Sequence, residues 1–163
     1  MASGELKKRN IDNRLTDIET GVINERNISY RVLRQKWGED SNLWDKLEHG
    51  LKQLQTQEEL DQYLYSYGPM TERQWSALLK EFKCPSTPFQ IIDYGAGQGL
   101  ATIHLLDQLI ELDSELPDAL TLVDLSEIAL ERAEKLLACY KGGTTRSIIG
   151  LRRNLSNIKA SDL

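Results

Sequence analysis

The stretch FQIIDYGAGQGLATIHLL, residues 89–106, carries the clearest structural signal in this sequence. It starts with an apolar run that ends at Asp93, and glycines follow at alternate positions, Gly95, Gly97 and Gly99. The residues after them are typical of a helix. A strand, a glycine-rich turn and a helix in this order bring the backbone close to a nucleotide-like ligand. The pattern therefore predicts a cofactor-binding turn.

The chain after this turn continues to alternate between strands and helices. We expect strands at residues 89–93, 120–123 and 147–151. One helix is expected at 100–112, and a second after Ser126, whose side chain can cap it. This order indicates a parallel sheet with right-handed crossovers. The predicted fold class is α/β.

The first 88 residues contain apolar side chains at helical spacing and no strand pattern. We expect them to form a helical cap region, with residues 89–163 as the cofactor-binding sheet half. One tyrosine ring of Tyr63, Tyr65 and Tyr67 is a candidate to cover a ligand, with ordinary packing or surface exposure as the alternative. The expected helices lie at 10–22, at 30–37 behind a Ser29 cap, at 44–54, at 60–67, and at 71–82 behind a capping box of Thr71 and Gln74.

Composition and charge favour some classes of protein over others. The chain has 163 residues, 40% hydrophobic and 28% charged, which is typical of a globular protein. No apolar run approaches the roughly 18 residues that a membrane-spanning helix needs. The net charge of −5 gives nucleic-acid binding no support. Cys84 and Cys139 are far apart, so we expect two reduced thiols in a cytoplasmic protein.

An acidic residue ends the second expected strand. Neighbouring strand ends meet at the ligand crevice of a doubly wound sheet, so Asp124 should lie beside the glycine turn. A carboxylate there can accept two hydrogen bonds from a ribose diol. The alternative is that Asp124 is only a polar residue between strand and helix, just before Ser126. The occurrence of turn and acid together favours the ribose role.

The details of the turn disfavour a dinucleotide. The dinucleotide fingerprint is G-x-G-x-x-G, but Leu100 occupies the position three residues after Gly97. Asp93, two residues before the first glycine, would also repel a pyrophosphate. A nicotinamide-dependent oxidoreductase is therefore a disfavoured alternative.

IIDYGAGQGLA resembles the first motif, D/E-x-G-x-G-x-G, of class I S-adenosylmethionine-dependent methyltransferases, and LTLVDLSEIALERAEKL resembles their second motif. The resemblance implies that the turn wraps the methionine and ribose parts of S-adenosyl-L-methionine, that the strand-two acid holds the ribose, and that the next residue lies against adenine. A third position, after strand three, holds an amide where the family often has a carboxylate. The implied cofactor-binding residues are Asp93, Gly95, Ala96, Gly97, Gly99, Asp124, Leu125 and Asn154.

The family's sheet has seven strands, whereas three are expected here. The strand-four motif, which faces the substrate in the family, has no candidate, and His49 and His104 have no acid and nucleophile at recognisable spacing. An exposed sheet edge would need a partner chain or a second copy to cover it. We expect the cofactor-binding, N-terminal portion of a methyltransferase, inactive alone, with a protein or small-molecule acceptor favoured over nucleic acid. The alternative is a non-catalytic cofactor-binding or protein-interaction module.

Overall fold

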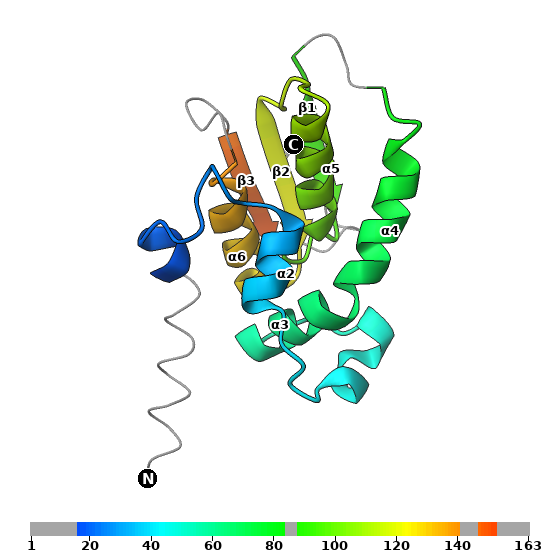
Figure 1. The fold of residues 1–163 in the computed structure, drawn as a ribbon. Coiled ribbons are helices and arrows are strands. Elements are labelled where there is room, and N and C mark those ends of the chain that lie inside the picture. Colours follow the sequence, from blue (N-terminus) through cyan, green and yellow to red (C-terminus); the bar gives the residue numbers. More distant parts are fainter. Residues whose placement is uncertain (1–15, 84–87, 141–146, 153–163) are drawn as a thin grey trace.

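The computed structural model describes residues 16–83, 88–140 and 147–152 (Figure 1). Residues 16–19 are helical. The elements that follow are α2 (Tyr30–Trp37), the 3-10 helix η1 (Trp44–Gly50), α3 (Gln57–Ser66), α4 (Gly68–Leu79), β1 (Gln90–Tyr94), α5 (Leu100–Glu111), β2 (Ala119–Asp124), α6 (Glu127–Leu137) and β3 (Ser147–Arg152).

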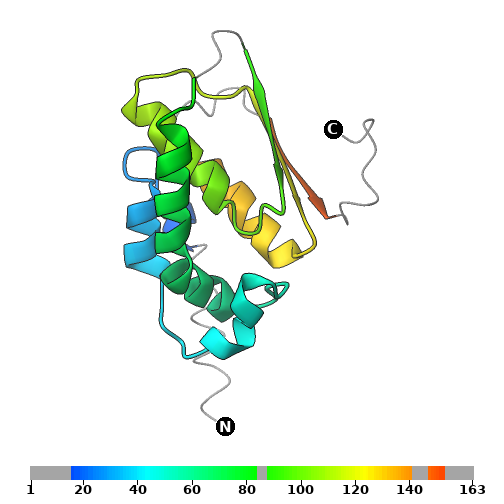
Figure 2. The same ribbon diagram turned by 90° about the vertical axis from the view of Figure 1, so that its right-hand side faces the viewer.

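The three strands form one parallel sheet in the order β1-β2-β3. Ile92 pairs with Thr121, which in turn pairs with Ile149. Figure 2 shows the helices gathered on one side of this sheet. The α/β fold class and the three strands are confirmed, with both ends of β1 and β2 and the final end of β3 shifted by one residue. The arrangement is that of an incomplete Rossmann-like fold, in which a parallel sheet is normally covered on both faces.

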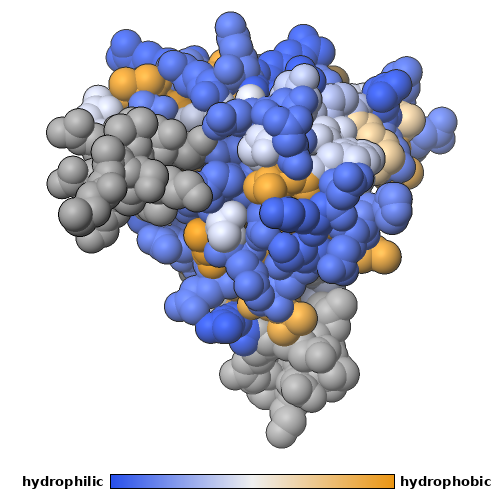
Figure 3. All heavy atoms as spheres, turned by 90° about the horizontal axis from the view of Figure 1, so that it is seen from below, coloured by the Kyte–Doolittle hydropathy of each residue, from blue (hydrophilic) through white to orange (hydrophobic). Residues whose placement is uncertain are grey.

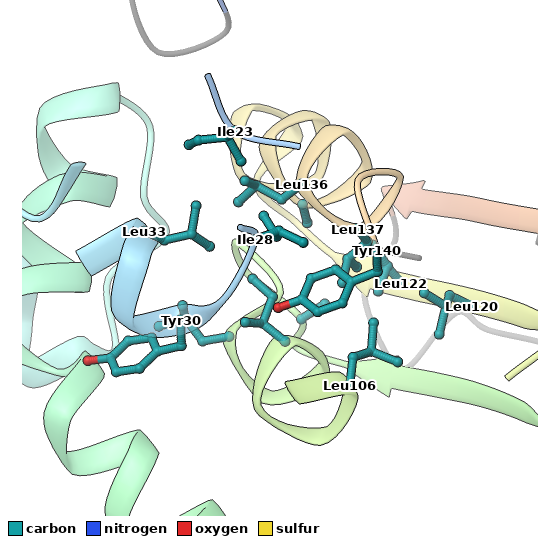
Figure 4. Packing of buried hydrophobic residues seen from close by; sticks show 14 of the residues in the cluster. Ile23, Ile28, Tyr30, Leu33, Leu106, Leu120, Leu122, Leu136, Leu137 and Tyr140 are labelled. Atoms are coloured by element: carbon teal, nitrogen blue, oxygen red, sulfur yellow. The ribbon is translucent and has the colours of Figure 1, made fainter. Parts of the chain in front are cut away.

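The helical region and the sheet half share one hydrophobic core. Ile23 and Leu33 from the first part of the chain pack with Leu136 of α6 and Leu120 of β2 (Figure 4). These four side chains are at most 2% exposed. The two halves therefore fold against each other rather than as separate bodies.

A buried ion pair also joins the two halves. The guanidinium group of Arg132, on α6, donates to the Asp61 carboxylate of α3 across 2.8 Å, and both side chains are almost fully buried. Gln57 Oε1 accepts a second bond at 3.3 Å, and the Trp37 ring centre lies 4.8 Å from the guanidinium carbon. Buried charges need such partners, because water no longer stabilises them.

The expected helix at 44–54 is wrong. The 3-10 helix η1 ends at Gly50, and Glu48 and His49 have left-handed backbone angles (φ 49° and 57°) that no α-helix contains. Leu51 is 87% exposed. Leu47 and Leu54 are both buried, but they belong to separate segments, so their helical spacing is coincidental.

The expected start of the helix at 71–82 is also wrong. Helix α4 begins at Gly68, with a proline in its first turn, as the fixed φ of proline favours. Thr71 is inside the helix and donates from Oγ1 to the Tyr67 carbonyl at 3.2 Å, so it is not a cap. The helical spacing predicts one apolar face of Trp75, Leu78, Leu79 and Phe82, but only Leu79 of these is buried, and Leu78 is 63% exposed.

No helix in the part of the chain that the structure describes is long and apolar enough to span a bilayer. The face seen from below in Figure 3, on the side where α3 lies in Figure 1, is mainly hydrophilic with small separate hydrophobic areas.

Candidate functional site

The glycine turn is hydrogen-bonded to the end of the neighbouring strand β2. The amides of Gly95 and Ala96 both donate to the Val123 carbonyl, at 2.8 and 3.1 Å. Gly95 and Gly97 have φ values of 72° and 53°. L side chains rarely adopt such angles, so these positions favour glycine.

The glycines of the turn serve two different purposes. A methyl group built on Gly95 or Gly97 would meet no atom within 4 Å, so both positions border open space. One built on Gly99 would lie 3.2 Å from Ala133 Cβ of α6. Gly95 and Gly97 thus leave room for a ligand, whereas Gly99 lets the turn pack on α6.

Asp124 connects the turn to the start of α6. Its Oδ2 accepts from the Gly97 amide and its Oδ1 accepts from the Ser126 amide, both at 2.8 Å. Ser126 caps α6 as predicted, accepting from the Ala129 amide at 3.3 Å. Each carboxylate oxygen has about two acceptor positions, so both retain capacity for a ligand hydroxyl.

Asp93 lies behind the turn rather than in the wall of the cavity in front of it. Its Oδ2 accepts from Thr102 Oγ1 at 2.7 Å, which ties β1 to the first turn of α5. Burial raises the pKa of Asp93, hydrogen bonds from Thr102 oppose this, and the nearby Asp124 carboxylate raises the pKa further. Asp93 therefore supports the turn instead of facing its open side.

A cavity of about 430 Å³ lies in front of the turn. One wall consists of the turn, including Ala96 and Gly97, and of Asp124 and Leu125 at the end of β2. The opposite wall comes from the helical region: residues 50–54, called here the 50–54 segment, together with Tyr63 and Thr71. The helical region therefore caps the site.

Side-chain hydrogen bonds to the backbone hold the 50–54 segment in place. Gln53 Nε2 donates to the Leu125 carbonyl at 2.9 Å, and Ser126 Oγ donates to the Leu54 carbonyl. Gln98, in the glycine turn, donates to the Leu60 carbonyl of α3 at 3.0 Å. These contacts bridge the two halves next to the cavity.

The only charge in the described cavity wall that no ion pair neutralises is negative. Lys52 Nζ lies 2.6 Å from Glu59 Oε1, so its charge is neutralised. Burial tends to raise the pKa of Glu59, but the bond from Lys52 and the amides of Gln55 and Thr56 outweigh it and hold that pKa below its usual value. Asp124 is the other charged group in the wall. This arrangement suits a neutral or cationic ligand better than a phosphate.

The aromatic side chains singled out from the sequence separate in space. Tyr63 lines the cavity, whereas Tyr67 is buried and stacks on Tyr63 with ring centres 4.8 Å apart. Tyr65 is exposed beside Arg34, with its ring centre 5.6 Å from the guanidinium carbon. Only Tyr63 is therefore placed to touch a ligand in this cavity.

Sequence reasoning did not find the 50–54 segment or Thr71 as wall residues. The tyrosine group gave a signal for Tyr63, but nothing in the spacing of residues 50–54 marks them as part of a site.

Asn154 lies outside the described residues. Cys139 is a free thiol, and burial raises its pKa.

No protein-family model matches this chain, and a search of curated proteins found no match.

Proposed function

We propose that this chain binds S-adenosyl-L-methionine in the cavity in front of the glycine turn, as the cofactor-binding portion of a methyltransferase. The observation that carries the proposal is the open space at Gly95 and Gly97 directly beside the Asp124 carboxylate. A nucleoside ligand needs a backbone that it can approach closely and an acid that can accept hydrogen bonds from its hydroxyl groups. The volume is within the range of small-molecule sites, about 300–1,000 Å³.

The proposal gives roles to residues on both walls of the cavity. The Asp124 carboxylate accepts from the ribose hydroxyls, Leu125 lies against the adenine, and the turn around Ala96 follows the methionine part. Tyr63 and the 50–54 segment close the opposite side and exclude water. The bound cofactor supplies a methyl group on a positively charged sulfur, which suits a wall whose free charge is negative.

The charge distribution also supports this ligand over a dinucleotide. A pyrophosphate would need cations or free amides at the turn, yet Lys52 is paired with Glu59 and the Gly97 amide already donates to Asp124. Leu100 is buried at the first position of α5, where the dinucleotide motif has glycine.

The wall supplies no general base among the residues described. Its titratable groups are Lys52, Tyr63 and Asp124. Lys52 is ion-paired, and burial, with a contribution from Tyr67, raises the pKa of Tyr63. The Asp124 carboxylate accepts from two backbone amides and, under this proposal, from the ribose hydroxyls, so it is not available as a base. We therefore propose that the acceptor and any base come from elsewhere and that this chain is inactive alone. A protein or small molecule is the favoured acceptor, and the proposed location is the cytoplasm.

Calorimetric titration with S-adenosylhomocysteine, the demethylated product, tests the proposal. We expect saturable binding, and no binding of a nicotinamide dinucleotide at the same concentration. Folded protein that gives no heat and no thermal shift with millimolar product would refute it. Tight binding of the dinucleotide instead would favour an oxidoreductase.

The second candidate is a non-catalytic cofactor-binding or interaction module, which the absence of a base in the described wall favours. Ile92 and Tyr94 of β1 and Ile149 of β3 are exposed. They alternate with the core-facing Ile91 or pair with Ile92 through Thr121, so they lie on the face of the sheet away from the helices (Figure 2), which supports a partner chain or a second copy against that face. A stable complex in gel filtration, together with cofactor binding but no methyl transfer to any acceptor tested, would support the module.

A further inference from the structure

A second cavity, of about 380 Å³, lies between the start of α2, the middle of α4 and the second half of α5. It shares no lining residue with the cavity at the glycine turn. The two sites therefore use different surfaces of the protein.

The wall of this second cavity is acidic. Glu72 of α4 and Asp107 and Glu111 of α5 contribute carboxyl groups, and Arg31 is the only basic side chain among its described lining residues. Such a wall attracts cations and repels anions.

Two buried polar atoms of this wall, Tyr30 Oη and His104 Nε2, have no hydrogen-bond partner among the described residues. His104 is 7% exposed, and its Nε2 forms no hydrogen bond with any residue that the structure describes. Burial lowers the pKa of His104, although Glu72 opposes this, so the ring stays neutral and one of its nitrogens can accept a hydrogen bond. A buried polar atom without a partner is destabilising unless a ligand or water satisfies it.

Arg31 carries a guanidinium cation that already pairs with Glu72 in this wall. Its Nε lies 3.2 Å from Glu72 Oε1, and its side chain is 86% exposed. An exposed ion pair of this kind adds little stability, so a ligand can displace it at small cost. Ile28, Leu79 and Ile110 also line the cavity, and they would contact an aliphatic chain attached to the cation.

A metal ion fits less well. No group of three or more His, Cys, Asp and Glu side chains in the described ranges is arranged to hold one. Both oxygens of Asp107 are already engaged, by the Tyr30 amide at 2.9 Å and the Tyr140 hydroxyl at 2.7 Å.

We propose that the second cavity binds a primary alkylammonium group, which interacts with Glu72 and Glu111, donates to His104 Nε2 and lays its aliphatic chain on Leu79 and Ile110. The same chemistry is present in a lysine side chain and in a free diamine. The site does not depend on the function proposed for the first cavity.

Calorimetric titration with N-acetyl-lysine methylamide and with putrescine tests the site and distinguishes the two sources. Binding of either amine, with none of 1-butanol, supports the proposal, and the tighter ligand identifies the source. Prior saturation with S-adenosylhomocysteine should leave amine affinity unchanged. No binding of either amine at millimolar concentration would overturn the proposal.

Three surface variants, one of them a control, sharpen the test. Glu111→Gln should weaken amine binding about fivefold, the size expected of one partly exposed charge pair, whereas Glu81→Gln, an exposed change outside the cavity, should not. Arg31→Ala should tighten binding, because it removes the competing cation. Equal affinity of the two glutamine variants, or weaker binding by Arg31→Ala, would overturn the proposal.

Discussion

The carboxylate of Asp124 accepts a hydrogen bond from the Gly97 amide at 2.8 Å, which joins the end of β2 to the turn that follows β1. The two residues are 27 positions apart in the chain. Because the same carboxylate also accepts from Ser126, it fixes the turn and the start of α6 relative to each other. The structural and the ligand-binding interpretations of Asp124 are therefore compatible.

Asp124→Ala should abolish most of the binding of S-adenosylhomocysteine. It should also lower the free energy of unfolding by about 1–3 kcal/mol, because the Gly97 and Ser126 amides lose their acceptor. Calorimetry at a temperature where the variant is folded separates the two effects. Asp118→Ala, an exposed change just before the opposite end of β2, is the matched control and should leave both quantities unchanged. Normal affinity in folded Asp124→Ala protein would contradict the ribose role.

Gly95→Ala should damage ligand binding more than folding. Gly95 and Gly21 have almost the same backbone angle, φ 72° and 74°, and neither has an atom within 4 Å of an added methyl group. Both alanine variants should therefore lose about 1–2 kcal/mol of stability, the cost of a left-handed L residue. Only the Gly95 methyl would enter the cavity, so only that variant should lose affinity for S-adenosylhomocysteine. Equal affinities would show that the ligand does not approach the turn.

The sheet half was predictable because its signals are local. An apolar run, positive-φ glycines and the Ser126 cap each act within a few residues, and the structure has the turn, β2 and α6 in the expected places. The meeting of Asp124 with the turn was also predictable, because consecutive parallel strands end at one edge of the sheet.

The helical wall of the site was not predictable, because its geometry depends on contacts distant in sequence. Residues 44–54 have helical spacing, but left-handed angles at Glu48 and His49 end the helix and send the next residues across the cavity. Gln53 meets the Leu125 carbonyl 72 positions away. A periodic pattern contains no information about such a partner.

Arg132→Met should destabilise the fold strongly. It leaves the Asp61 carboxylate buried without its cation, which typically costs about 3–5 kcal/mol. The double variant Asp61→Leu and Arg132→Met should recover most of this loss, because no buried charge remains. Arg152→Met, which breaks the exposed pair with Glu127, is the control and should change stability by less than about 0.5 kcal/mol. Urea unfolding measures all three; a small loss for Arg132→Met alone would contradict the role of the pair.

His104 should make the protein less stable as the solution becomes mildly acidic. Burial lowers the pKa of His104 in the folded state, against a weaker opposing effect of Glu72, whereas the unfolded chain keeps a value near 6.5. Below about pH 6.5 the unfolded state therefore binds more protons, and the free energy of unfolding falls as pH falls, by at most about 1.4 kcal/mol per pH unit.

His104→Gln removes this titration, so its stability should vary less than that of the wild type between about pH 7.5 and 5.5. His49→Gln, at an exposed position, should keep the wild-type slope. Urea unfolding at several pH values gives the slopes, and carboxyl groups that titrate in all three proteins cancel in the comparison. If His104→Gln and the wild type had the same slope, the neutral ring required for amine binding in the second cavity would lose its support.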